Sequence, residues 1–323
     1  MRKPLFACAI LLLAGLAAPW ALRAEILPVS GPLPARTMER LLVLNAVHIG
    51  NRVVAVGDRG YAVYSGDDGA SWKRAKVNAD APVPLLTSVF FSDPMTGWAV
   101  GHDAVILATR DGGETWERQF FAPSEQKPLL DILFLDKNRG FAVGAYSSFY
   151  ETADGGKTWS ARKILNDDKH LNAIVRMGDE KVLIAGEAGA LLRSDDGGKN
   201  WTTLESPYKG SYFGALVAED GAVVIFGLRG KIFRSIDLGK SWKAIDNASL
   251  ATLMGGTKLP DGTLVIAGSA GTVLVSRDNG HSFTPLATGS TRAYSKALLG
   301  SPNSVLLFGE AGVSTVAVAS AKR

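Results

Sequence analysis

An aspartate beside glycines recurs along this chain, and such a carboxylate can serve as a general acid or base, as a metal ligand or as a hydrogen-bond acceptor that fixes a turn. The string TRDGGETW (109–116) is one copy of a pattern, [S/T]-x-D-x-G-x-[S/T/N]-[W/F], that we name the Asp box. Six copies place their aspartates at Asp67, Asp111, Asp154, Asp196, Asp237 and Asp278. The copies end on Trp72, Trp116, Trp159, Trp201, Trp242 and Phe283. These aromatic positions are 44, 43, 42, 41 and 41 residues apart, a period typical of four-stranded propeller blades.

Six aspartates spread around a ring cannot converge on one active site, so a structural role is predicted for them. The Asp side chain is suited to accept hydrogen bonds from nearby backbone N–H groups, and the aromatic residue to pack between blades. A calcium loop needs a D-x-D-x-D-G run with a distal Glu, which SDDGGKNW does not supply. The four histidines lack the spacing of metal ligands. We therefore predict no metal and no cofactor.

A second signature precedes each Asp box and is named here the Gly loop. Its seven copies, from VGDRG (56–60) to FGEAG (308–312), begin their glycines at positions 57, 101, 144, 186, 227, 268 and 309. Short runs rich in Val, Ile and Leu flank these loops and are typical of β-strands. Each repeat is predicted to run strand, turn, strand, Gly loop, strand, Asp box, strand. The fold class is thus all-β, a seven-bladed β-propeller.

The last repeat lacks an Asp box and a fourth strand. A propeller that leaves such an edge open risks pairing with other chains. The segment ILPVS (26–30) lies at the spacing from Gly57 that separates an outer strand from the next Gly loop. It is predicted to supply the outer strand of the seventh blade and close the ring.

Residues 1–24 are predicted to be a signal peptide, and residues 25–323 a single propeller domain. Arg2 and Lys3 form a basic start, Leu5 to Leu16 an apolar core, and Ala24 a plausible last residue before cleavage. A retained anchor is disfavoured because the apolar run is short for a span. We expect export to the periplasm, or to the thylakoid lumen in a photosynthetic host, with no transmembrane span in the mature chain.

Charge and cysteine content narrow the classes of partner. The single cysteine, Cys8, lies in the predicted signal, so the mature chain would hold no disulfide. Without Arg2, Lys3 and Arg23, the chain keeps 32 basic against 31 acidic residues. This near-neutral balance removes the main compositional argument for nucleic acid. We expect a monomer that binds a protein partner and no nucleic acid.

The Gly loops and the crossovers between repeats are predicted to share one face. Their variable residues combine Arg with aromatic groups, as protein-recognition surfaces do, although solvated loop tips are the alternative. The partner-binding candidates are Arg59, Arg74, His102, Asp103, Arg118, Tyr146, Arg162, Glu187, Arg229 and Glu310. His102 and Glu187 are interpreted as surface residues rather than as a catalytic pair.

The repeats VGDRGYAVYSGDDGASW, VGHDAVILATRDGGETW and AGEAGALLRSDDGGKNW resemble the photosystem II stability/assembly factor family of BNR/Asp-box propellers. The resemblance covers roughly residues 40 to 315. It implies an exported, non-catalytic scaffold that holds membrane-protein subunits during assembly, although the family also occurs in bacteria without a photosystem. Arg59, Arg74, Arg118 and Arg162 are possible counterparts of the family's Arg-rich partner-binding patch.

The alternative function is that of a secreted, sialidase-like glycoside hydrolase. Sialidases carry an Arg-Ile-Pro motif, which is absent from this sequence. A hydrolase of the two-carboxylate type needs paired acids across a cleft. Asp58, Asp103, Glu187 and Glu310 share the predicted face, but the sequence does not show that any two of them converge.

Overall fold

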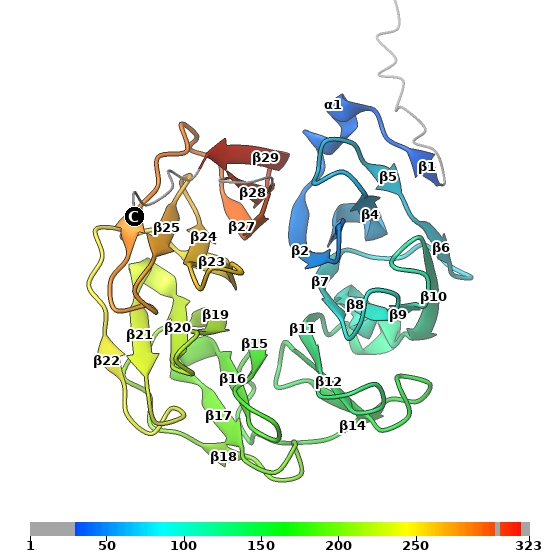
Figure 1. Cartoon of the computed structure of the whole chain (residues 1–323). Coiled ribbons are helices and arrows are strands. Elements are labelled where there is room, and N and C mark those ends of the chain that lie inside the picture. Colours follow the sequence, from blue (N-terminus) through cyan, green and yellow to red (C-terminus); the bar gives the residue numbers. More distant parts are fainter. Residues whose placement is uncertain (1–29, 301–303, 318–323) are drawn as a thin grey trace, which may run out of the picture.

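The computed structural model describes residues 30–300 and 304–317, which form seven β-sheets around a central axis (Figure 1). The prediction of a seven-bladed, all-β propeller is confirmed. From the axis outward, the first sheet contains β2 (Val43–Ile49), β3 (Arg52–Gly57), β4 (Ala62–Ser65), β5 (Lys73–Arg74) and β1 (Gly31–Pro32). The second sheet contains β7 (Leu86–Phe91), β8 (Gly97–Gly101), β9 (Ile106–Thr109), β10 (Thr115–Phe120) and β6 (Lys76–Asn78). The third sheet contains β11 (Leu129–Phe134), β12 (Gly140–Gly144), β13 (Phe149–Thr152) and β14 (Ser160–Ala161).

The remaining four sheets follow the same plan. They contain β15 (Leu171–Arg176), β16 (Val182–Gly186), β17 (Leu191–Ser194) and β18 (Thr202–Thr203); β19 (Tyr212–Val217), β20 (Val223–Gly227), β21 (Ile232–Ser235) and β22 (Lys243–Ala244); β23 (Leu253–Lys258), β24 (Leu264–Gly268), β25 (Val273–Ser276) and β26 (Thr284–Pro285); and β27 (Tyr294–Leu299), β28 (Ser304–Gly309) and β29 (Gly312–Ala317). The helices are α1 (Ala35–Met38) and the 3-10 turns η1 (Asp58–Gly60), η2 (His102–Ala104), η3 (Pro123–Glu125), η4 (Glu187–Gly189) and η5 (Leu228–Gly230).

The second strand of each sheet carries most of the core. In β8, β12 and β16 every residue is buried, because both faces of a blade pack against neighbouring blades. A strand covered on both faces loses the alternation of polar and apolar residues that a half-exposed strand keeps. This explains the continuous apolar runs in the sequence.

The outer strands are shorter than expected from the sequence, in which a longer run begins at the aromatic residue of each Asp box. Strands β14, β18 and β22 are two residues long, and both residues of each are exposed. Little apolar surface is buried there, so hydrogen bonds alone hold the pairing. Only in the second sheet does the outer strand, β10, reach six residues, and there β6 pairs with it in parallel as a fifth strand.

The ends of the ring meet by packing. Within the described residues the seventh sheet has three strands. Strand β1 pairs with β5 of the first sheet, with Gly31 opposite Arg74. Apart from Ser30, the segment 26–30 lies outside the described residues, so its predicted role in the seventh blade remains untested, but the residues that follow it join the first blade.

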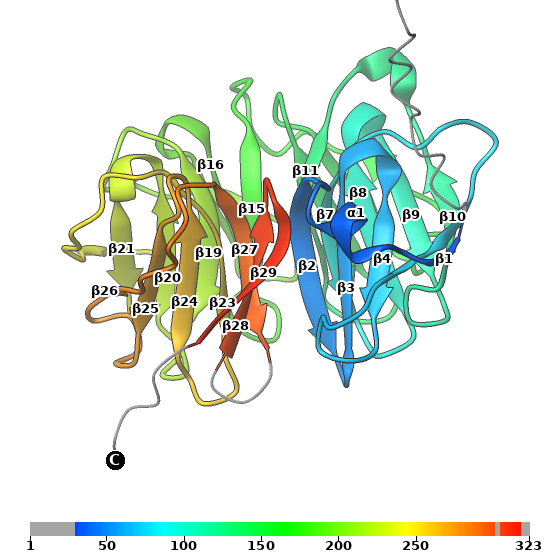
Figure 2. The same cartoon turned by 90° about the horizontal axis from the view of Figure 1, so that it is seen from above.

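The first and seventh blades contact each other as other neighbours do. Strands β2 and β27 lie side by side (Figure 2), and Ser295 Oγ donates to the carbonyl of Val43 at 2.7 Å. An equivalent hydrogen bond joins the second and third blades, where Thr87 Oγ1 donates to the carbonyl of Leu129 at 2.6 Å. The Trp72 and Phe308 rings pack edge to face, with their centroids 6.1 Å apart. The ring is therefore closed by a side-chain interface of the kind that joins its other blades.

The predicted signal peptide, residues 1–24, lies outside the described residues. Among those described, no helix has the length and apolar character needed to cross a membrane.

Candidate partner-binding surface

Each Asp box is a turn organised around its carboxylate. In the second blade, Asp111 Oδ1 accepts hydrogen bonds from the Thr115 backbone N–H at 2.9 Å and from the Thr109 hydroxyl at 2.8 Å. The Thr109 hydroxyl in turn accepts the N–H of Gly113 at 3.0 Å. The carboxylate and the hydroxyl thus occupy backbone donors of the turn between the third and fourth strands.

The same contacts recur in the other five boxes. The aspartates Asp67, Asp154, Asp196, Asp237 and Asp278 each accept a backbone N–H four residues later, at 2.8–3.0 Å. These bonds favour the ionised carboxylate. The Thr158 side chain, followed by its backbone N–H, lowers the pKa of Asp154 to about 2. The pKa of each of the other box aspartates is lowered as well.

The aromatic residue of each box packs toward the preceding blade. Trp116 is fully buried with Val54 and Val56 of the first blade. Its indole N–H donates to the Gly113 carbonyl at 3.0 Å, and Trp72 makes the same bond to Gly69. The corresponding indoles Trp159, Trp201 and Trp242 are half-buried, and their N–H groups have no hydrogen-bond partner. The aromatic positions thus differ in how tightly they join neighbouring blades.

Replacing Asp111 by alanine should lower the free energy of unfolding by about 1–2 kcal/mol, because the Thr115 N–H loses its acceptor in a partly buried turn. Urea unfolding followed by tryptophan fluorescence measures this change. Asp168 is exposed in a crossover and supplies the control, since Asp168→Ala should change the free energy by less than about 0.5 kcal/mol. Equal values for the two variants would contradict a bracing role for the box carboxylate.

The Gly loops and the crossovers lie on one face, where backbone hydrogen bonds join them. The N–H of His102 donates to Leu85 O, that of Ala145 to Pro128 O and that of Leu228 to Ser211 O, each at 2.9 Å. The crossover approaches so closely that a Cβ at Gly101 would lie 2.1 Å from Leu85 O. Glycine at this position is therefore required by the contact. The turns after these glycines place non-glycine residues at positive φ, among them Arg59 at 53° and Arg229 at 57°.

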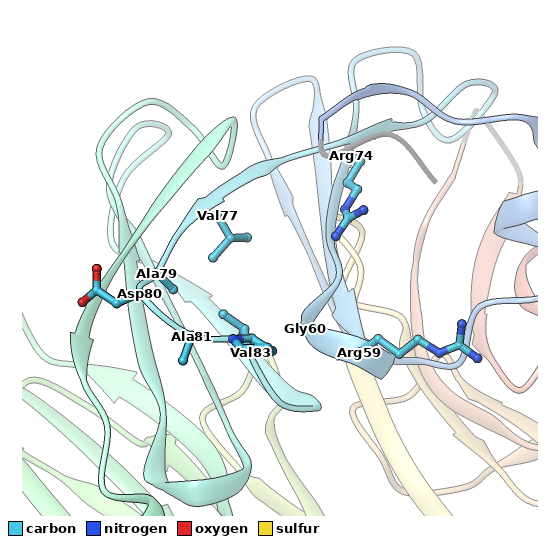
Figure 3. A pocket seen from close by; sticks show the side chains of 9 residues that line it. Arg59, Gly60, Arg74, Val77, Ala79, Asp80, Ala81 and Val83 are labelled. Atoms are coloured by element: carbon cyan, nitrogen blue, oxygen red, sulfur yellow. The ribbon is translucent and has the colours of Figure 1, made fainter. Parts of the chain in front are cut away.

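A pocket of about 430 Å³ lies between the first blade and the crossover to the second (Figure 3). We name it the arginine groove, and it is lined by Arg59, Gly60, Arg74, Val77, Ala79, Asp80, Ala81, Pro82 and Val83. Arg59 and Arg74 come from the first blade, and Asp80, Ala81 and Val83 come from the crossover. The groove thus combines two guanidinium groups and one carboxylate with an apolar lining.

The charges of the groove differ in how far they are engaged. The Arg59 side chain is 77% exposed and extends away from Asp80 (Figure 3); within the described part of the chain it pairs with Asp58 at 3.3 Å. The Arg74 guanidinium stacks on the Tyr61 ring, 4.3 Å from its centroid. Arg118 reaches the edge of the groove through Asp80, with Nη2 3.3 Å from Oδ2. Two of the predicted arginines therefore line the groove, and a third, Arg118, pairs with a residue of its lining.

The fourth arginine lies elsewhere. The guanidinium of Arg162 donates to the carbonyls of Gly198 and Lys199 in the fourth Asp box, and it pairs with Glu151 at 3.2 Å. It also stacks on the Phe149 ring, 5.2 Å from the centroid. These contacts join neighbouring blades, so the structure separates Arg162 from the arginine groove.

The remaining candidates divide into internal braces and free surface groups. Glu187 Oε2 accepts the N–H of His170 at 3.0 Å, and Glu310 Oε2 accepts that of Ala293 at 3.1 Å. Each carboxylate therefore joins a crossover to a Gly loop, and this structural contact explains its position without a catalytic role. The other candidates stand apart on the loops: His102 and Arg229 are exposed, Asp103 is half-buried, and Tyr146 is 54% exposed with its ring edge against His170.

Sequence reasoning missed the wall that the crossover contributes to the groove. Asp80, Pro82 and Val83 lie in the stretch NADAPVPL (78–85), which reads as an ordinary loop. A usable signal is its apolar and proline content, because a solvated loop of this length would be more polar. Among the described residues, no cluster of His, Cys, Asp or Glu is arranged to hold a metal ion.

Part of the sequence is similar to known proteins. Residues 120–265 match the family model described as photosynthesis system II assembly factor YCF48. A curated relative, the chloroplastic photosystem II stability/assembly factor HCF136 of Cyanidioschyzon merolae, is 40% identical over 65 residues. That match spans 20% of this chain and only 14% of the relative's length.

Solved structures share the fold over most of the chain. YCF48 bound to D1 peptide has a TM-score of 0.68 at 20% identity, covering 90% of this chain and 94% of the other. The GH74 xyloglucanase of Xanthomonas campestris has a TM-score of 0.72 at 13% identity, covering 88% of this chain and 53% of the other. The resemblance to photosystem II assembly-factor propellers is confirmed by the sequence match and the shared fold together.

Proposed function

We propose that this chain is an exported, non-catalytic scaffold that uses the arginine groove to bind an acidic, extended segment of a protein partner. The single observation that carries the proposal is that Arg59 and Arg74 line one pocket, with Arg118 paired to Asp80 of its lining. Guanidinium groups bind carboxylates through paired, charge-assisted hydrogen bonds. The partner segment would place an acidic group between Arg59 and Arg74.

The shape and lining of the groove support a peptide rather than a small ion. Its volume of about 430 Å³ falls in the range of ligand pockets, roughly 300–1,000 Å³. Val77, Pro82 and Val83 offer an apolar surface for a partner side chain beside the charged contact. Arg and apolar groups together are typical of interface centres.

The partner's class is proposed from similarity. A propeller of the same fold has been solved as YCF48 bound to D1 peptide, and the matched family consists of assembly factors. We propose by analogy that the partner here is a subunit of a membrane complex, met in the periplasm or, in a photosynthetic host, in the thylakoid lumen. A monomer suffices, because the groove is built within one chain.

Reversing the charge of Arg59, Arg74 and Arg118 together to Glu should reduce capture of the partner at least tenfold, through the loss of steering and of the guanidinium contacts. Immobilised protein would be incubated with detergent-solubilised host membranes, and the captured subunits quantified by mass spectrometry. The melting temperature of the variant should stay within a few degrees of the parent's.

Two controls separate loss of binding from loss of fold. Arg229→Glu changes an exposed arginine of another blade and should leave capture unchanged. The single variant Arg59→Glu touches the most exposed arginine of the groove and should weaken capture without unfolding risk. Undiminished capture by the triple variant would refute this site.

A glycoside hydrolase remains the second candidate, favoured by the shared fold with the GH74 xyloglucanase. Xyloglucan, aryl glycosides and sialosides would be assayed for release of reducing sugar or aglycone. We expect no turnover. Turnover that Asp103→Asn or Glu187→Gln abolishes would replace the scaffold proposal with an enzymatic one.

A further inference from the structure

A cavity of about 170 Å³ lies on the axis of the ring, where the inner strands of all seven blades meet. Its lining includes Asn45 from β2, Thr87 from β7, Asp131 from β11, Asn172 from β15 and Lys296 from β27. It is separate from the arginine groove and belongs to no feature singled out in the sequence.

One position of the inner strands shows how the cavity is built. In every blade, the pairing between the inner strand and the second strand shifts in register near the start of the inner strand, for example between Leu129 and Asp131 in the third blade. The first residue paired after this shift occupies the same structural position in all seven blades. From the seventh blade through the sixth, this position holds Lys296, Asn45, Ser88, Asp131, Ala173, Gly214 and Gly255. Four consecutive blades thus contribute polar side chains, and the next three contribute none larger than a methyl group. At this position, therefore, the polar side chains lie on one side of the axis.

The polar side chains of the second and third blades and Asn45 form a chain of hydrogen bonds that ends at the carboxylate of Asp131. Asn45 Nδ2 donates to Ser88 Oγ at 3.0 Å, and Ser88 Oγ donates to Asp131 Oδ1 at 2.8 Å. Asp131 also accepts the backbone N–H groups of Ile132 and Ile174, each at 2.9 Å. Burial raises the pKa of Asp131, and these donors act against that rise. The carboxylate therefore needs no cation from the cavity.

Among the residues described, Lys296 has no direct partners of this kind, and Asp131 acts on it only through its charge. Its ammonium makes no hydrogen bond and no ion pair within the described residues, although it is close enough to Asp131 for each to affect the other's pKa. Burial lowers the pKa of Lys296, the expected result for a positive charge removed from water. Asp131 and Lys296 are the charged residues that line the cavity. The charge left without direct partners is therefore positive.

We propose that the axial cavity binds a small, singly charged oxyanion of the size of acetate, held by the ammonium of Lys296 beside the amide of Asn45. A single negative charge matches the one charged group of the cavity that lacks a direct partner, whereas a dianion would be repelled more strongly by Asp131. The cavity volume of about 170 Å³ exceeds the roughly 30 Å³ share of one water molecule several-fold, so a ligand of a few heavy atoms fits.

The test titrates the full mature protein with sodium acetate and follows the lysine side chains by NMR, with sodium chloride at matched ionic strength as the reference. We expect one lysine resonance, absent from Lys296→Met, to shift and saturate, and the affinity for acetate to fall at least tenfold in that variant. Lys258→Met removes an exposed lysine from the end of the inner strand β23 and should leave the titration unchanged. Inorganic phosphate should bind more weakly at a pH where it is mostly dianionic.

Folding and ligand outcomes can be told apart. Lys296 is half-buried and makes no direct hydrogen bond or ion pair within the described residues, so Lys296→Met should stay folded, which circular dichroism checks. Asn45→Ala provides a second variant in which acetate affinity should fall. A saturating shift that persists in Lys296→Met, or no acetate-specific shift in the folded parent, would overturn the proposal. Since the arginine groove is distant in sequence and separately lined, partner capture does not decide either outcome.

Discussion

Replacing Trp72 by alanine should lower the free energy of unfolding by about 3–5 kcal/mol, the range for removing a buried aromatic side chain. Trp72 is 5% exposed and lies in the first blade, but its ring edge meets Phe308 of the seventh blade at 6.1 Å. The adjoining Gly69 packs on Leu306, 3.2 Å from the position its Cβ would take. The Trp72 indole therefore packs between the first and seventh blades and helps to close the ring.

The matched control is Trp116→Ala, because Trp116 is the same wedge between the second and first blades. Both variants would be unfolded in urea and monitored by circular dichroism. We expect similar losses and a single transition for each, since the closing interface is built like the others. A loss below about 1 kcal/mol for Trp72→Ala alone, or a second transition in that variant, would show that the ends of the ring are held by something other than this interface.

Acid should unfold this protein through its Asp boxes. Asp154, Asp196 and Asp237 have pKa values of about 2 in the folded chain, held there by side-chain and backbone donors at the residue four positions later. In an unfolded chain the Asp pKa is about 3.9. A depressed folded pKa adds stability that is fully present above about pH 4 and is lost as the pH falls toward 2.

Other groups modify the size of this effect but not its sign. The pKa of Asp136 is also lowered to about 2: burial opposes this shift, while the Arg139 side chain and backbone donors produce it. Asp131 acts in the opposite direction, because burial raises its pKa and protonation in acid then favours the folded state. Among the carboxyl groups of the described residues, six box aspartates have a lowered pKa and Asp131 has a raised one, so the net result is a loss of stability in acid.

Urea midpoints measured at pH 7, 4, 3 and 2.5 should stay level down to about pH 4 and then fall steeply. The double variant Asp154→Asn, Asp237→Asn keeps a side-chain oxygen as acceptor but removes two titrating groups, so its midpoint should fall less steeply below pH 4. A parent and a double variant with parallel profiles would contradict the assignment of acid sensitivity to the boxes.

The repeated parts of this molecule could be predicted from the amino-acid sequence. The spacing of the Asp boxes and Gly loops specified seven blades, because each blade is a local unit whose turns are built by residues a few positions apart, such as Thr109, Asp111 and Thr115. The shared face of Gly loops and crossovers was also predictable, since it follows from the strand order. The clustering of Arg59, Arg74 and Arg118 was expected only as far as that face.

Features that depend on contacts between blades could not be predicted from the sequence and became visible in the folded ring. It separated Arg162 from the other arginines, used Glu187 and Glu310 as braces, and brought Asp80 into the groove. It placed Lys296 and Asp131 on one axis, although 165 positions separate them in the chain. The physical reason is that a repeat pattern specifies the geometry of one blade and its turns, whereas grooves and axial sites are formed by side chains that differ between blades and meet only when the ring closes.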